Sequence, residues 1–221
     1  MVGQSTEQLI GSAILIAIFL LLAFPIHECA HAFAAYRLGD ATAKMYGRLS
    51  LNPIVHFDPY GGMFLVISAL AGTGLLFGWA KPTPVNPSNL RDRRNGEVIV
   101  ALAGPGSNLV MAIVGALIFR ALGSVAPDLP GIIWYVLRLF VSISIVLAIF
   151  NLIPIPPLDG SAILFRFLSP ATAWQIRPVL YQYGGIILLV IIFTLVLVPP
   201  FGQGLGRLVS GLTDLLLYGP T

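Results

Sequence analysis

The sequence contains little charge. Only 10% of its 221 residues are Asp, Glu, Lys or Arg, whereas a soluble domain has about 25%. Hydrophobic residues make up 57% of the chain, and its mean hydropathy is +0.91. These values exclude an ordinary soluble domain and predict an integral membrane protein with the lipid bilayer as its solvent.

Cysteine, histidine and clustered basic residues are also scarce. The single cysteine, Cys29, excludes a disulfide within the chain. The 12 Lys and Arg residues are spread over the loops and form no block or basic helix face, which argues against nucleic acid as a partner. With only three histidines, any histidine-based site has few candidate ligands.

Long uncharged runs predict an all-α fold, a polytopic bundle of transmembrane helices with four to six membrane segments. Apolar runs of about 18 residues or more are long enough to span a bilayer. The predicted spans are residues 9–26, 98–119, 131–153 and 178–198. A short helix is expected at residues 160–168, and an amphipathic surface helix at residues 204–218.

Glycine and proline interrupt the chain between the first two spans. Residues 47–61 mix prolines and polar residues with apolar ones and predict a loop or a short β-like segment. Residues 60–80 are uncharged but rich in glycine, which favours a re-entrant segment over a straight span. The proline-rich residues 81–87 are predicted to be extended.

The basic residues predict the orientation in the membrane. If the N-terminus lies outside, all basic residues except Arg120, Arg138 and Arg207 fall on the cytoplasmic side, as the positive-inside rule requires. This orientation places both flanks of residues 60–80 in the cytoplasm, so that segment would enter and leave the membrane on one side.

The stretch from Pro25 to His31 places two imidazoles and a carboxylate in the first predicted helix. His27 and His31 are four residues apart, so on a helix both rings lie on one side and can bind one zinc ion. Glu28 lies about 100° further round the helix, close enough to act on a water molecule at the metal but poorly placed as a third ligand. Pro25 lacks an N–H and is expected to kink the helix near its far end.

A catalytic zinc site needs a third protein ligand. The two candidates are His56 and Asp159. The predicted topology returns Asp159 to the depth of the histidines, and a carboxylate within a membrane protein is a functional candidate because its unpaired burial is costly. His56 is a spare ligand or an acid, or else a structural hydrogen-bonding group in its loop.

Three motifs carry a resemblance to a known family. The first is the HExxH of residues 27–31, the second is AGPGSN at residues 103–108, and the third is NLIPIPPLDG at residues 151–160. In this order, and within hydrophobic segments, they resemble the site-2 protease family of intramembrane zinc metalloproteases. The resemblance covers about residues 10–168. Because the chain lacks a PDZ insertion and a large soluble domain, it resembles the compact prokaryotic type.

The resemblance implies one Zn²⁺ ion held by His27, His31 and Asp159, with Glu28 as the catalytic base. It implies a single integral-membrane domain over residues 1–221, with a catalytic core at about residues 10–168 and a C-terminal span and tail at residues 169–221. Asn108 and Asn151 are candidates for contact with the oxyanion or the substrate, or for bonds between helices.

The expected function is hydrolysis of a peptide bond in or near a transmembrane segment of another membrane protein. The expected location is a prokaryotic plasma membrane, with the active site near its cytoplasmic side; the sequence leaves the oligomeric state open. Residues 81–87 and 47–58 either offer an extended edge to an unwound substrate or serve as rigid connectors. The alternative function is a zinc transporter or membrane metal sensor, although transport has no obvious use for Glu28.

Overall fold

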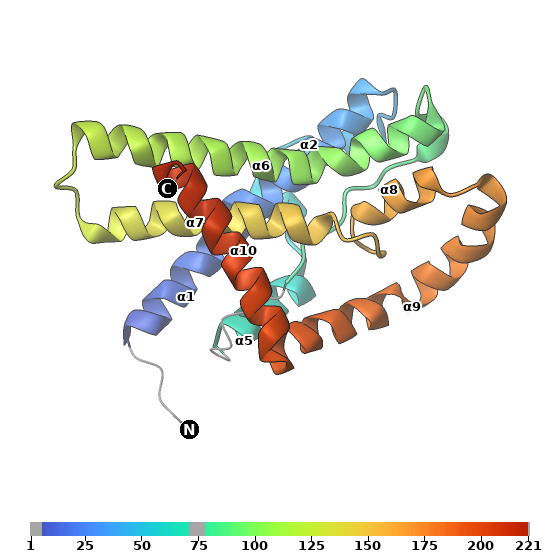
Figure 1. Ribbon diagram of the computed structural model, residues 1–221. Coiled ribbons are helices and arrows are strands. Elements are labelled where there is room, and N and C mark those ends of the chain that lie inside the picture. The colour runs from blue at the N-terminus through green and yellow to red at the C-terminus, as the bar shows by residue number, and fades with distance from the viewer. Residues whose placement is uncertain (1–5, 71–77, 221) are drawn as a thin grey trace.

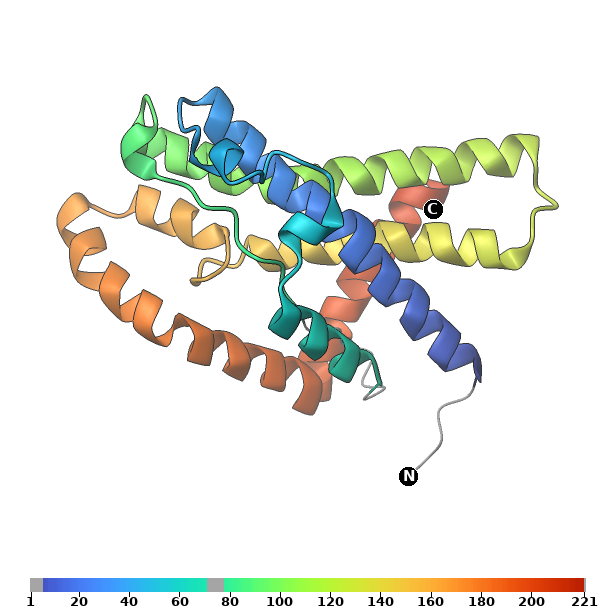
Figure 2. The same ribbon diagram turned by 180° about the vertical axis from the view of Figure 1, so that it is seen from behind.

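A computed structural model describes residues 6–70 and 78–220, and over those ranges the protein is a bundle of helices without strands (Figures 1 and 2). The all-α prediction is therefore confirmed. The helices in chain order are α1 (Thr6–Ile18), η1 (Phe19–Ala23), α2 (Phe24–Arg37), α3 (Thr42–Met45), α4 (Pro53–His56), α5 (Pro59–Leu70), η2 (Pro87–Asn89), α6 (Arg93–Val125), α7 (Gly131–Asn151), α8 (Gly160–Phe167), α9 (Pro170–Leu197) and α10 (Pro199–Tyr218).

Within residues 6–70 and 78–220, four helical stretches are long and apolar enough to cross a membrane. They are residues 13–37, which join α1, η1 and α2, and the helices α6, α7 and α9. Their mean hydropathies lie between 1.9 and 2.4. With these four spans the chain is a polytopic integral membrane protein, as predicted.

The first span is one long helix with a π-helical turn in the middle. The predicted kink at Pro25 takes this form: η1 lies just before the proline, and the Phe24 N–H donates to the carbonyl of Phe19, five residues back. Such a turn accommodates a proline because it moves the preceding carbonyls away from the ring. The helix then continues to Arg37, so the prediction that His27 lies near its end was wrong.

The helices α6 and α7 form the hairpin on which the other elements pack. Helix α2 packs on α6, and α10 crosses the α6–α7 hairpin (Figure 1), with Val209, Thr213 and Leu217 buried. The expected surface helix at residues 204–218 is therefore a member of the bundle. Arg120 holds the C-terminal end of α10 by donating to the carbonyls of Leu215 and Leu217 in its last turn.

The segment between the first span and α6 lacks the predicted β-like structure. Helices α3 and α4 lie on either side of an irregular stretch at residues 47–52. Helix α4 forms because Asn52 caps it, accepting the Ile54 N–H at 3.0 Å, and because Pro53 suits the first helical position.

The two ends of the glycine-rich segment lie together. Helix α5 has 12 residues, too few to span a bilayer. A side chain at Gly61 would collide with the carbonyl of Trp79, and one at Gly78 would lie 2.7 Å from the Cβ of Leu65. The chain thus doubles back on itself, in agreement with a re-entrant segment; residues 71–77 of that prediction lie outside the described residues.

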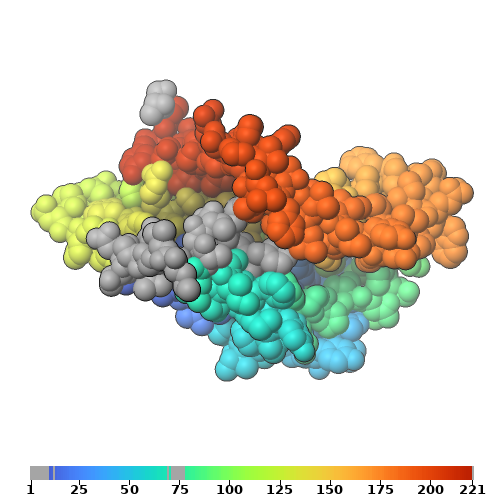
Figure 3. All heavy atoms as spheres, turned by 90° about the horizontal axis from the view of Figure 1, so that it is seen from below, coloured from blue at the N-terminus to red at the C-terminus, as the bar shows by residue number. Residues whose placement is uncertain are grey.

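Helix α9 contacts the rest of the molecule at few places. A side chain at Gly184 would collide with the carbonyl of Pro156, Phe165 stacks on Tyr181 at 6.2 Å, and Arg177 bonds Glu97 at 3.1 Å. In Figure 3, α9 and α10 form an orange-to-red band across one face, beside α5 in cyan. Most of the apolar surface of α9 is left exposed, as expected of a helix in lipid.

Candidate metal centre

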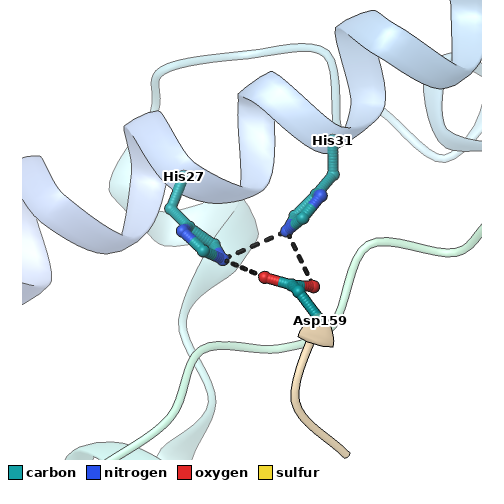
Figure 4. A group of neighbouring side chains, drawn as sticks. All are labelled: His27, His31 and Asp159. Atoms are coloured by element: carbon teal, nitrogen blue, oxygen red, sulfur yellow. Dashed lines mark hydrogen bonds and ion pairs between the residues drawn. The ribbon is translucent and has the colours of Figure 1, made fainter. Parts of the chain in front are cut away.

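The two histidines of α2 converge on the aspartate that precedes α8 (Figure 4). The Nε2 atoms of His27 and His31 lie 3.0 Å apart. Asp159 faces both rings, with Oδ2 3.2 Å from Nε2 of His27 and Oδ1 3.3 Å from Nε2 of His31. The structure thus brings the three predicted ligands together from distant parts of the sequence.

A tight turn carries Asp159 to this position. Helix α7 ends at Asn151, and the chain then folds back so closely that a side chain at Gly160 would collide with the carbonyls of Leu152 and Ile153. Burial opposes ionisation of Asp159, but its interactions with His27 and His31 lower its pKa to about 2. It therefore faces the rings as a carboxylate.

Polar contacts hold the far end of α8 against α6. Arg94 donates to the carbonyls of Arg166 and Leu168 at 3.0 and 3.3 Å, and Arg166 donates to the Asn95 side chain at 2.8 Å. These bonds join α8, which begins directly after Asp159, to α6, which packs on the two histidines.

The donor set suits zinc. The ligating atoms of His27, His31 and Asp159 all lie within 4.8 Å of one another, and both histidines are buried. Two imidazole nitrogens that converge on a carboxylate fit a cation, and two imidazoles with a carboxylate are a common ligand set for catalytic zinc.

His56 lies outside this group. It is buried in α4, and its Nε2 donates to the carbonyl of Ser50 at 2.7 Å. Among the described residues, no group of possible metal ligands includes it. The geometry favours the structural role for His56 and leaves Asp159 as the candidate third ligand.

Helix α6 contacts both imidazoles at their Nδ1 atoms. The Nδ1–H of His31 donates to the carbonyl of Val100 at 2.7 Å, and the amide of Asn108 lies 3.1 Å from Nδ1 of His27. Gly104 faces both rings, so that a side chain there would meet them. The sequence analysis missed Val100; Gly104 and Asn108 both lie within the AGPGSN motif, which was the available signal.

Glu28 is bonded to the extended segment that follows α5. Its Oε2 accepts the backbone N–H of Thr83 at 2.8 Å, and the Thr83 hydroxyl donates to its backbone carbonyl at 3.0 Å. Glu28 is therefore next to the metal ligands but is held as a separate group, the arrangement expected of a base. Nothing in the sequence singled out Thr83.

The segment of residues 81–86, which we call the strap, is extended and crosses the bundle between α5 and α6 (Figure 2); the predicted extended segment was one residue too long, because Pro87 begins η2. On one edge, the backbone N–H of Lys81 donates to the carbonyl of His56, and that of Thr83 donates to the side chain of Glu28. On the other edge, positions 82 and 84 are prolines without an N–H, and the Asn86 N–H donates to Asp40. The edge formed by residues 82, 84 and 86 therefore has no free N–H to pair with a substrate strand. This favours a rigid connector over an edge that binds an unwound substrate.

Asp40 fixes the far end of the strap. Its fully buried carboxylate accepts the N–H of Asn86 at 2.7 Å, the side chain of Asn89 at 3.0 Å and the N–H of Thr42 at 3.0 Å. Burial raises the pKa of Asp40, but these hydrogen bonds outweigh burial and leave it below its usual range.

The two candidate asparagines differ in their surroundings. Asn108 is fully buried behind His27, whereas Asn151 donates to the carbonyl of Leu147 within its own helix at 2.9 Å. Contact of either residue with an oxyanion or a substrate stays a prediction.

Comparison with known proteins identifies the family. Residues 126–198 match the model of peptidase family M50. The chain is 37% identical over 183 residues to the Bacillus subtilis protein named "Putative zinc metalloprotease YwhC", covering 81% of this chain and 80% of that protein. It is also similar to two proteins that are both named "Putative zinc metalloprotease Rip2". The one from Mycolicibacterium smegmatis is 32% identical, with 84% of this chain and 69% of that protein covered. The one from Mycobacterium tuberculosis H37Rv is 28% identical, with 86% and 71% covered.

No solved structure matches the chain. The similarity to YwhC extends over most of both proteins. On this similarity and the family match, the chain belongs to peptidase family M50 and is a zinc metalloprotease of the site-2 protease family.

Proposed function

We propose that this metalloprotease hydrolyses peptide bonds in or near transmembrane segments of other membrane proteins. The observation that carries the proposal is the position of the candidate metal centre. His27 and His31 lie in a membrane-spanning helix, and they pack on α6 at Val100 and Gly104, roughly 10 Å or more along that helix from Arg93. A peptide bond has to enter the membrane region to reach them.

Each side chain of the centre has a distinct part in hydrolysis. His27, His31 and Asp159 would hold zinc, which supplies the Lewis acidity that polarises a carbonyl and acidifies water. Glu28 accepts the proton of the attacking water and delivers it to the amine that leaves. The Thr83 N–H donates to the Glu28 carboxylate and orients it.

The distribution of basic residues supports a site near the cytoplasmic side of a prokaryotic plasma membrane. The end of the bundle nearer the centre carries Arg94, Arg166 and Arg177, whose hydrogen bonds join α6 to α8 and α9. At the other end, Arg120 and Arg138 contact α10. Basic residues concentrate on the cytoplasmic side of membrane proteins.

The test uses the purified full chain in liposomes with a model membrane protein that has one transmembrane segment. Wild type is expected to cut that segment, at a position mapped by mass spectrometry, and Glu28→Ala is expected to retain zinc but not cut. Cleavage only in a soluble part of the substrate would contradict the intramembrane proposal. Equal cleavage by the variant would contradict the role of Glu28, and zinc flux without cleavage would favour a transporter.

A further inference from the structure

Asn108 is the buried polar residue that the hydrolytic chemistry leaves unused. It comes from α6, is fully buried, and its amide nitrogen lies 3.1 Å from Nδ1 of His27. Its Oδ1 is buried without a hydrogen-bond partner among the described residues. A buried carbonyl oxygen without a donor costs about 1–3 kcal/mol in general, so its retention beside a ligand calls for a reason.

The two histidines are held differently by α6. His31 directs Nδ1 at the carbonyl of Val100, which can only accept, so the proton is fixed on Nδ1 and Nε2 keeps its lone pair. His27 faces an amide, which carries a donor at one end and an acceptor at the other. Helix α6 therefore fixes one tautomer of His31 but allows either tautomer of His27.

With the amide nitrogen toward His27, Nδ1 accepts and the ring proton lies on Nε2. That proton points at Asp159, whose Oδ2 is 3.2 Å away. This arrangement suits the metal-free centre, because the N–H of His27 faces the carboxylate. It does not suit metal binding, since Nε2 needs its lone pair to be a ligand.

We propose that Asn108 is a positioning residue that selects the metal-binding tautomer of His27 by turning its amide through 180°. In the turned orientation Oδ1 accepts the Nδ1–H, and Nε2 of His27 is free to bind the ion together with Nε2 of His31. The two amide ends are similar in size, so the turn needs little space. Aspartate could serve only the metal-bound form, and leucine neither.

The experiment measures zinc and does not depend on any substrate, so its outcome is distinct from that of the cleavage test. Wild type, Asn108→Leu and Asn108→Asp are loaded with zinc, and its release to a chelating dye is followed. Asn108→Leu is expected to release zinc about 10- to 100-fold faster, as found for outer-shell partners of metal ligands. Asn108→Asp is expected to retain zinc at least as well as wild type, because its carboxylate accepts the Nδ1–H.

Ser144→Ala is the matched control, because Ser144 is also fully buried in a membrane helix but bonds only the carbonyl of Phe140 in its own helix. It should release zinc at the wild-type rate. Equal release by Asn108→Leu and wild type would overturn the proposal, as would rapid release from Asn108→Asp.

Nitrogen NMR of the His27 ring in the wild-type protein covers the case in which Asn108→Leu fails to fold. The proton is expected on Nε2 without zinc and on Nδ1 with zinc. A ring that carries its proton on the same nitrogen in both states would overturn the proposal.

Discussion

Replacing Gly104 by alanine should displace both imidazoles of the metal centre. A Cβ at this position would collide with Nε2 of His31 and would lie 2.5 Å from Cε1 of His31 and 2.6 Å from Cε1 of His27. Carbon atoms in contact are normally about 3.5 Å apart or more, so each ring has to retreat by roughly 1 Å. Both rings are buried, so this movement meets other side chains and overpacking should cost about 1–3 kcal/mol.

The larger effect should be on metal binding. Ligand distances in a working metal site hold to within about 0.2 Å, and a shift of roughly 1 Å exceeds that several-fold. We expect the zinc affinity of Gly104→Ala to fall at least about 10- to 100-fold, the range seen when the support of a ligand is lost. Proteolysis should fall with it and recover in part when zinc is added in excess.

Gly106→Ala is the matched control. It lies two residues away on the same helix, and a Cβ there would meet nothing within 4 Å. Both substitutions gain the same helix propensity, about 1 kcal/mol, so the difference between them reports the contact with the rings. Zinc titration of the two variants in detergent is the assay. Equal zinc affinity in both would refute the reasoning that Gly104 makes room for the ligands.

Two further predictions concern the strap. Thr83→Pro removes the N–H that bonds Glu28 and keeps the segment extended, so proteolysis should fall about 10- to 100-fold for a bond worth about 1.5–3 kcal/mol. Zinc content should stay unchanged, and Thr83→Val, which keeps the N–H, should stay near wild type; an unimpaired proline variant would contradict this role. Asp40→Asn should lower the unfolding temperature near pH 7. Because the pKa of Asp40 is lowered in the folded protein, its contribution is present above the unfolded pKa and lost as pH falls through the folded value. The difference from wild type should therefore shrink below about pH 4 in thermal unfolding scans, and a constant difference down to pH 2 would contradict it.

The sequence predicted the membrane spans because their signal is one of composition over a long run. It predicted the histidine pair because four residues on a helix fix a shared face. Asp159 was reached from topology and resemblance together, since no local pattern links it to residues far earlier in the chain. The extent of the first helix was underestimated because the predicted span was ended at residue 26, where the uncharged run stops, whereas the helix continues to Arg37.

The remaining features depend on tertiary contacts that a single sequence does not encode locally. The bond from Thr83 to Glu28 and that from His31 to Val100 involve backbone groups, which every residue carries. The place of α10 in the bundle depends on contacts with α6 and α7, while its polar residues alone favoured a surface helix. The short α4 depends on the cap by Asn52, a signal that was present and was not used.

The most direct test of the account is X-ray absorption spectroscopy of the zinc-loaded protein. His27, His31 and Asp159 predict nitrogen and oxygen ligands alone, at about 2.0–2.2 Å, with one oxygen contribution lost in Asp159→Ala. A sulfur ligand at about 2.3 Å would place Cys29 at the metal. That result, or a spectrum unchanged in Asp159→Ala, would contradict the assignment of the centre.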